Sequence, residues 1–119
     1  LTNTGTMLAL GNARIDSGNL DNTGGTIQAG TSQSSGSSSL NVTSAGVLTN
    51  DQGTIAANND LKLTSTALSN QSGQIGAQSI AIDTRQGALN NDDGKIIASA
   101  GNLDVQSGAL HSDKGWLQA

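Results

Sequence analysis

The residues that could carry chemistry in this chain are few and scattered. His111 is the only histidine, cysteine is absent, and all nine acidic residues are aspartates. A metal site normally gathers several His, Cys or carboxylate ligands, and a nucleophile needs a base beside it. One histidine supplies neither arrangement. We therefore predict that His111 is solvated, and that the chain has no catalytic residue, metal site or bound cofactor.

Two acidic features suggest chemistry but fall short of it. Residues 91–94, Asn-Asp-Asp-Gly, faintly resemble a calcium loop but lack the alternating ligands and the distal Glu of an EF-hand, so we expect a polar turn. Folding could also bring two aspartates together for glycoside hydrolysis, and the sequence leaves that possibility open. Sites that cleave sugars usually stack the substrate on aromatic side chains. Trp116 is the only aromatic residue, which argues against a polysaccharide-active enzyme.

The elements that would position these residues come from a repeat. A ten-residue motif, Leu-x-Asn-x-x-Gly-x-Ile-x-Ala, has four strict copies, at 20–29, 48–57, 68–77 and 89–98. In an imperfect copy at 1–10, Leu8 and Leu10 hold the register and Gly5 comes one place early. In another at 110–119, Ser112 replaces the asparagine. A repeat with a period between 20 and 50 residues indicates a solenoid, a propeller or an array of small units.

The period is near 20 residues, with one insertion. Successive motif leucines lie 19, 28, 20, 21 and 21 residues apart. The long interval contains a low-complexity stretch rich in Ser and Gly, residues 30–39, which we interpret as a loop that bulges from one coil.

Each period also carries a second apolar element. It alternates apolar and polar residues, which is typical of a strand with one buried face. Its copies are Ala13-x-Ile15, Leu40-x-Val42, Leu61-x-Leu63, Ile80-x-Ile82 and Leu103-x-Val105. One coil cannot close a sheet by itself, but stacked coils can pair equivalent strands in parallel. The sequence therefore predicts one all-β domain over residues 1–119, a parallel β-helix of about six coils that is right-handed by the crossover rule.

The recurring asparagine and glycine suggest how neighbouring coils are joined. A buried amide is destabilising unless it is hydrogen-bonded, and amides stacked one coil apart can bond to one another. We expect such a structural ladder in preference to a ligand-binding row. Its members are Asn3, Asn22, Asn50, Asn70 and Asn91. The motif glycine is expected to supply backbone freedom for a turn.

Charge and composition exclude several partners. The net charge is −4, and the five basic residues lie far apart, so the electrostatic footprint of a nucleic-acid-binding protein is missing. The same charge argues against docking on anionic lipid. No apolar run is long enough to span a membrane. No signal peptide is present, as expected of an internal fragment of a much longer protein.

The repeat resembles the haemagglutinin repeats of filamentous haemagglutinin and of contact-dependent growth-inhibition effectors, over essentially the whole chain. This resemblance implies a very long exoprotein that is secreted to the bacterial cell surface through an outer-membrane transporter of the two-partner secretion type. It also implies a filament in which adhesion sites or a toxin lie elsewhere on the polypeptide.

Three functions follow, in order of preference. The first is a structural filament segment that presents a distal adhesin or toxin. The second is direct adhesion to a glycan or protein receptor on a host or target cell, through the loop at 30–39 or through Trp116. We place Trp116 outward, where it packs on a neighbouring coil or loop or contacts a partner. The third is the polysaccharide-active enzyme.

Overall fold

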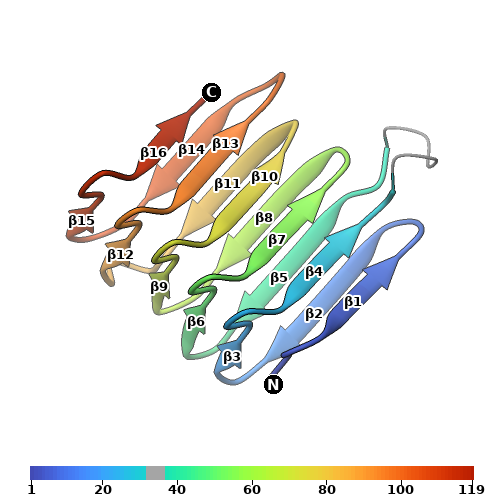
Figure 1. Cartoon of the computed structure of the whole chain (residues 1–119), viewed down its shortest axis with the longest axis horizontal. Coiled ribbons are helices and arrows are strands. Elements are labelled where there is room, and N and C mark those ends of the chain that lie inside the picture. Colours follow the sequence, from blue (N-terminus) through green and yellow to red (C-terminus); the bar gives the residue numbers. More distant parts are fainter. Residues whose placement is uncertain (32–36) are drawn as a thin grey trace.

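The computed structural model describes residues 1–31 and 37–119 and is all-β, with three parallel sheets wound into a solenoid (Figure 1). Sheet 1 contains β1 (Thr6–Ala9), β4 (Thr26–Ala29), β7 (Thr54–Ala57), β10 (Gln74–Ala77), β13 (Lys95–Ala98) and β16 (Trp116–Gln118). Sheet 2 contains β2 (Ala13–Ser17), β5 (Leu40–Ser44), β8 (Asp60–Thr64), β11 (Ser79–Asp83) and β14 (Leu103–Gln106). Sheet 3 contains β3 (Leu20–Asp21), β6 (Val47–Thr49), β9 (Ala67–Ser69), β12 (Leu89–Asn90) and β15 (Leu110–His111). The described segments include no helix that could cross a membrane.

Every strand pairs in parallel with the equivalent strand of the next coil, which confirms the predicted β-helix. Thr54 pairs with Gln74 and Gln74 with Lys95, so the coils are 20 and 21 residues long. The second apolar element forms sheet 2 in the predicted register, as in the pairing of Val42 with Leu63. Within the described residues, the six motif copies correspond to five complete three-stranded coils, and β16 adds a sixth rung to sheet 1.

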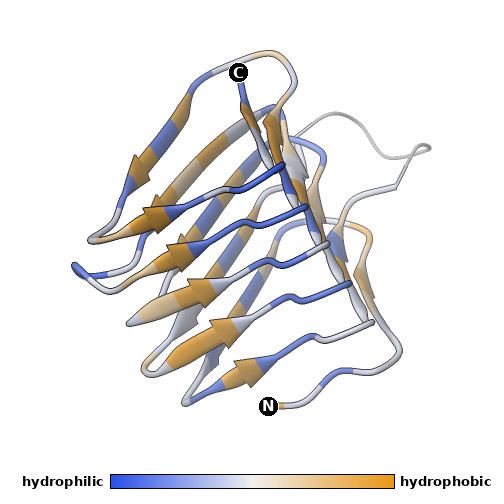
Figure 2. Cartoon of the chain, turned by 60° about the vertical axis from the view of Figure 1, so that its left-hand side comes forward, coloured by the Kyte–Doolittle hydropathy of each residue, from blue (hydrophilic) through white to orange (hydrophobic). Residues whose placement is uncertain are grey.

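The core is a stack of identical apolar positions. Leu48, Leu68 and Leu89 lie in register in sheet 3, and each is no more than 2% exposed. Apolar bands recur at the same place in successive coils in Figure 2. Leu1 and Leu110 hold the same position in the first and last coils, where one side lacks a neighbouring coil, and both are 50% exposed.

The first coil departs from the predicted register. Met7 pairs with Ile27 and Ala9 with Ala29, so Leu8 lies beside Gln28 and is 53% exposed. Leu8 and Leu10 are therefore not the inward residues of this copy, and that prediction is wrong. The reason is Gly5, whose carbonyl accepts a hydrogen bond from Thr26 as the motif glycine does in later coils. The turn before Gly5 is one residue shorter, so the following strand moves by one place and the opposite side chains point inward.

The predicted loop insertion lies between β4 and β5, at the corner that joins sheets 1 and 2 (Figure 1). Its central residues, 32–36, lie outside the described residues. Hydrogen bonds fasten the chain on both sides of them. Gly30 N donates to Ala9 O (2.7 Å), Asn58 Nδ2 donates to Thr31 O (2.7 Å), and Ser39 N donates to Asn12 Oδ1 (2.9 Å).

Candidate functional site

The five asparagines singled out by the repeat lie in one buried row. Four of them are completely buried, and Asn3, in the first coil, is 8% exposed. Each begins the turn that leads into sheet 1, which has four residues in the strict motif copies and is one residue shorter at Asn3. In the third coil, for example, Gly53 N donates to Asn50 O (3.0 Å) across this turn. We call this the amide corner.

Each amide in the row bonds to the amide of the next coil. Asn3 Nδ2 lies 2.7 Å from Asn22 Oδ1, and the three following links measure 2.7, 2.7 and 2.8 Å. The same nitrogen also bonds to two backbone carbonyls. Asn50 Nδ2 lies 3.3 Å from Gly53 O in its own turn and 3.1 Å from Gln74 O in the next coil. Among the described residues, no buried side-chain nitrogen or oxygen is left without a partner.

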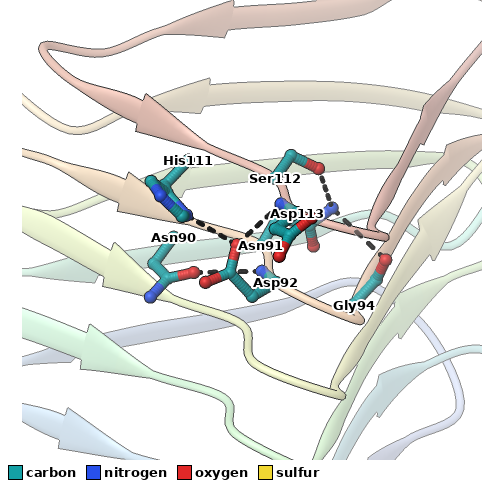
Figure 3. A network of polar contacts seen from close by, with 7 residues as sticks. All are labelled: Asn90, Asn91, Asp92, Gly94, His111, Ser112 and Asp113. Carbon is teal, nitrogen blue, oxygen red and sulfur yellow. Dashed lines mark hydrogen bonds and ion pairs between the residues drawn. The ribbon is translucent and has the colours of Figure 1, made fainter.

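The row ends at Ser112, which stands where the next asparagine would be. Asn91 Nδ2 donates to Ser112 Oγ at 3.3 Å and to Trp116 O at 3.0 Å (Figure 3 draws the serine link). The link from side chain to side chain is longer here than at any amide pair, because a hydroxyl reaches less far than an amide. The last coil is therefore the least firmly joined to the row.

The structure corrects the role predicted for the motif glycine. Gly53 and Gly73 do not have the left-handed φ, which belongs to the residue before each of them: Gln52 (58°) and Ser72 (55°). Glycine is required for space instead. A Cβ at Gly73 would overlap the backbone carbonyl oxygen of Asn50, one coil away, and would also crowd Asn70 Oδ1. The motif glycine therefore lets the turn pack directly on the neighbouring amide.

Carboxylates add links on the outside of the same corner. Gln71 and Asp113, which each follow a row position, donate their backbone N–H to a side chain and not to a backbone carbonyl of the neighbouring coil. Asp51 Oδ1 accepts from Gln71 N (2.9 Å) and from Ser69 Oγ (2.6 Å), both in the next coil. Asp92 Oδ1 likewise lies 2.7 Å from Asp113 N and 2.7 Å from His111 Nδ1 (Figure 3). These aspartates join successive turns.

His111 has an exposed side chain (72%), as the sequence predicted, but it is not isolated. Its hydrogen bond with Asp92 raises the pKa of the imidazole above its ordinary value, and the Asp92 charge adds to the effect. The same hydrogen bond lowers the pKa of Asp92, with help from the backbone N–H of Asp113. This pair was not predicted from the sequence. Its only signal was a spacing of 19 residues, close to one period.

The described residues contain no group of three or more His, Cys or Asp side chains that could hold a metal ion. Residues 91–94, which faintly resembled a calcium loop, form one turn of the amide corner, with Gly94 N donating to Asn91 O (3.0 Å). Asp83 and Asp104 share a shallow hollow of about 210 Å³ on sheet 2, beside Lys62. No aromatic side chain lines this hollow, so it offers no stacking platform for a sugar.

Trp116 lies on the outer face of sheet 1, where the register pairs it with Lys95. Its side chain is 56% exposed, and Lys95 Nζ lies 5.6 Å from the ring centroid, within range of a cation–π interaction. The outward position predicted for Trp116 is thus confirmed. The indole packs on the neighbouring coil through Lys95.

The chain matches the model of one protein family, described as the haemagglutinin repeat. The matches cover residues 1–52, 33–93 and 76–119, which together span the whole chain. No curated protein and no solved structure was found to match. Three overlapping matches to one model agree with a chain built from successive copies of a single unit.

Proposed function

Because the chain belongs to the haemagglutinin repeat family, we propose that it is a stiff spacer that holds an adhesin or a toxin away from the producing cell. Membership makes it a structural repeat of a filamentous surface adhesin-type protein, in a family that is structural and not enzymatic. The spacer role goes beyond family membership and is our proposal. A spacer must be long, regular and resistant to bending.

The observation that supports this role most directly is the continuity of the amide row. Each link from Asn3 to Asn91 joins two coils through a buried hydrogen bond of 2.7 or 2.8 Å. The three parallel sheets run alongside it, so every coil is held at each of its three sides. Each coil advances the axis by about 4.8 Å, the spacing of paired strands. Length is therefore gained by adding coils.

The proposed route to the cell surface is two-partner secretion through an outer-membrane transporter, the context to which the family points. The fold is compatible with such an exit. Every strand pairs with a strand one coil away, about one period distant in sequence. Coils can therefore add one after another as the chain emerges, since each needs only its neighbours.

Direct adhesion is the second candidate, and Trp116 is the observation in its favour. Exposed indole rings are enriched in binding surfaces, because the ring offers a large rigid area. The loop at residues 30–39 is the other predicted contact, and its centre lies outside the described residues. Trp116 would bind a glycan or a protein receptor on a host or target cell.

A segment exchange in the full-length exoprotein tests the spacer role. Residues 1–119 are replaced with an equal number of regular β-solenoid coils of unrelated surface sequence. We expect surface display and adhesion or toxin delivery to persist, because a spacer is defined by its length and stiffness. A scrambled segment of the same composition is the matched control and should abolish display.

Loss of binding after the exchange, with display intact, would contradict the spacer role and favour adhesion by this segment. Trp116→Ala in the native protein then identifies the contact. This variant should leave display and adhesion unchanged if the segment is a spacer, and should weaken adhesion if Trp116 touches a receptor.

A further inference from the structure

The sequence contains the acceptor pattern for N-linked glycosylation, Asn-x-Ser/Thr, at two places. One is Asn41-Val42-Thr43 and the other is Asn70-Gln71-Ser72. Asn70 is a member of the amide row, whereas Asn41 lies outside it. The two patterns are chemically equivalent in an unfolded chain, and the structure places them in opposite environments.

Asn41 lies on the outer face of sheet 2. Its strand, β5, alternates so that Leu40 and Val42 are buried while Asn41 is exposed. In the register, Asn41 stands between Arg14 and Lys62 of the adjacent coils. The Asn41 side chain makes no hydrogen bond with the described residues, so its amide is not needed by the fold.

The surroundings of Asn41 can accommodate a sugar. A hollow of about 290 Å³ opens beside it on the outer face of sheet 2. The polar side chains that line this hollow with Asn41 are Asn12, Ser39, Asp60 and Lys62. They offer donors and acceptors to the hydroxyl groups of a first sugar residue.

Asn70 is the opposite case. It is completely buried, and its Nδ2 donates to Asn91 Oδ1 (2.8 Å), Lys95 O (3.3 Å) and Gly73 O (3.4 Å). A sugar on that nitrogen would replace a hydrogen of the row and would need space in a close-packed interior. Modification at Asn70 is therefore incompatible with the folded coil.

We propose that Asn41 is an N-glycosylation site of this protein, modified before the chain folds, and that the fold excludes the same modification at Asn70. A transferase would form a bond from Asn41 Nδ2 to the anomeric carbon of a diphosphate-activated sugar. The bond from that carbon to the phosphate oxygen breaks, the diphosphate leaves with the electron pair, and a base of the transferase takes the amide proton.

The timing follows from the pairing of β5. This strand is bonded to β2 on one side and to β8 on the other, so a transferase cannot lift Asn41 and Thr43 out of the finished sheet. Transfer must precede folding. Both acceptor sites are then open, but only a chain left unmodified at Asn70 can complete its row.

Mass spectrometry of peptides from the secreted, folded exoprotein of the producing cells tests the proposal. We expect a sugar mass on the peptide that contains Asn41, and none on the peptide that contains Asn70. Thr43→Val should abolish the added mass and Thr43→Ser should retain it. Thr43 lies on the outer face of β5, so both variants should fold and be secreted.

Either of two results would overturn the proposal. The first is an Asn41 peptide without added mass throughout the secreted population. The second is a sugar on Asn70 in protein that retains its native circular dichroism, which would show that the fold does not choose between the sites. Persistence of the added mass in Thr43→Val would likewise contradict recognition of the acceptor pattern.

Discussion

Two corners of each coil bury polar side chains, and they use them differently. At the amide corner, between sheets 3 and 1, the side chains bond to one another from coil to coil. At the corner between sheets 2 and 3, the buried side chains are hydroxyls. Their bonds go to backbone carbonyls, as from Ser44 to Gly18 and Val47 and from Thr84 to Gly87. We call this the hydroxyl corner, and its buried members are Ser44, Ser65 and Thr84.

The two corners also differ in how constant their length is, measured as the number of residues between the inward apolar positions on either side. At the amide corner, Ile55 follows Leu48 by seven residues, and the same interval recurs in the three other strict copies of the motif. In the first coil, where the turn is one residue shorter, Met7 follows Leu1 by six residues. At the hydroxyl corner, the interval is five residues from Leu63 to Leu68 and seven from Ile82 to Leu89. In the amide row, each member bonds to the amide of the next coil. At the hydroxyl corner, Thr84 bonds to Gly87 O in its own turn, and Ser44 bonds to backbone carbonyls at Gly18 and Val47. The linked row therefore keeps the asparagines of successive coils aligned, even in the first coil, where Asn3 Nδ2 lies 2.7 Å from Asn22 Oδ1.

The largest predicted effect concerns space at the amide corner. Gly73→Ala places a methyl group against the backbone carbonyl of Asn50, which cannot rotate away, and should destabilise the protein by about 3 kcal/mol. Gly76→Ala is the matched control, since its Cβ would meet only Ile97 O at 3.9 Å. That variant should stay within about 0.5 kcal/mol of the native protein. Urea denaturation measures both, and equal effects would contradict close packing on the row.

The next effect compares the two corners directly. Asn70→Ala removes an acceptor from Asn50 and a donor from Asn91, both buried, and should destabilise by about 2 kcal/mol. Thr84→Val removes one bond, to Gly87 O at 2.7 Å, and should cost about 1 kcal/mol. Thermal denaturation of the two variants gives the comparison. A smaller decrease in melting temperature for Asn70→Ala than for Thr84→Val would mean that the amides do not couple the coils.

A gain of stability is expected where the row ends. Ser112→Asn should replace the 3.3 Å link from Asn91 to Ser112 with an amide pair like the others, and should stabilise by about 1 kcal/mol. The turn of this coil already has the motif glycine, Gly115, which lets it pack directly on Asn91. A Cβ at Gly115 would overlap Asn91 O. A guanidinium titration measures the change. Ser107→Asn, at the half-buried position of the hydroxyl corner in the same coil, is the control and should not increase stability.

The smallest effect is a dependence on pH at the outer edge of the amide corner. The hydrogen bond raises the pKa of His111 above 6.5, so its contribution is complete below pH 6.5 and is lost as the pH rises through the raised value. It lowers the pKa of Asp92 below 3.8, so that contribution is present above pH 3.8 and is lost in stronger acid. The difference in melting temperature between the native protein and His111→Gln should be greatest between these limits. A difference that grows above pH 7 would contradict the assignment.

The sequence predicts features that repeat with the coil. Leucine, isoleucine and asparagine recur at nearly constant intervals, so the stacked sheets and the row of amides are visible without coordinates. The hydroxyl corner is not visible in this way, because its serines resemble the many exposed serines and its length varies. Ser44 and Ser65 hold equivalent positions of this corner in successive coils, yet the apolar spacing across it is six residues from Val42 to Leu48 and five from Leu63 to Leu68.

Two other contacts between coils were not predicted from the sequence. Glycine is required at position 73 because a Cβ there would overlap the backbone carbonyl oxygen of Asn50, one coil away. His111 bonds to Asp92, which also lies one coil away. The register of the first coil was predicted wrongly because Leu8 fits the apolar pattern and Met7 does so equally well. The position of Gly5 decides which of the two residues points inward. This could not be read from the sequence, because it depends on how the turn packs on the next coil.

The central claim is that buried amides bond from coil to coil, and exchange of their side-chain protons with deuterium tests it most directly by NMR. Asn22, Asn50 and Asn70 should exchange their Nδ2 protons at least about a thousandfold more slowly than exposed Asn41, because release requires unfolding that costs about 5 kcal/mol or more. Exchange of Asn70 at the rate of Asn41 would show that its side chain faces water, and would contradict the account.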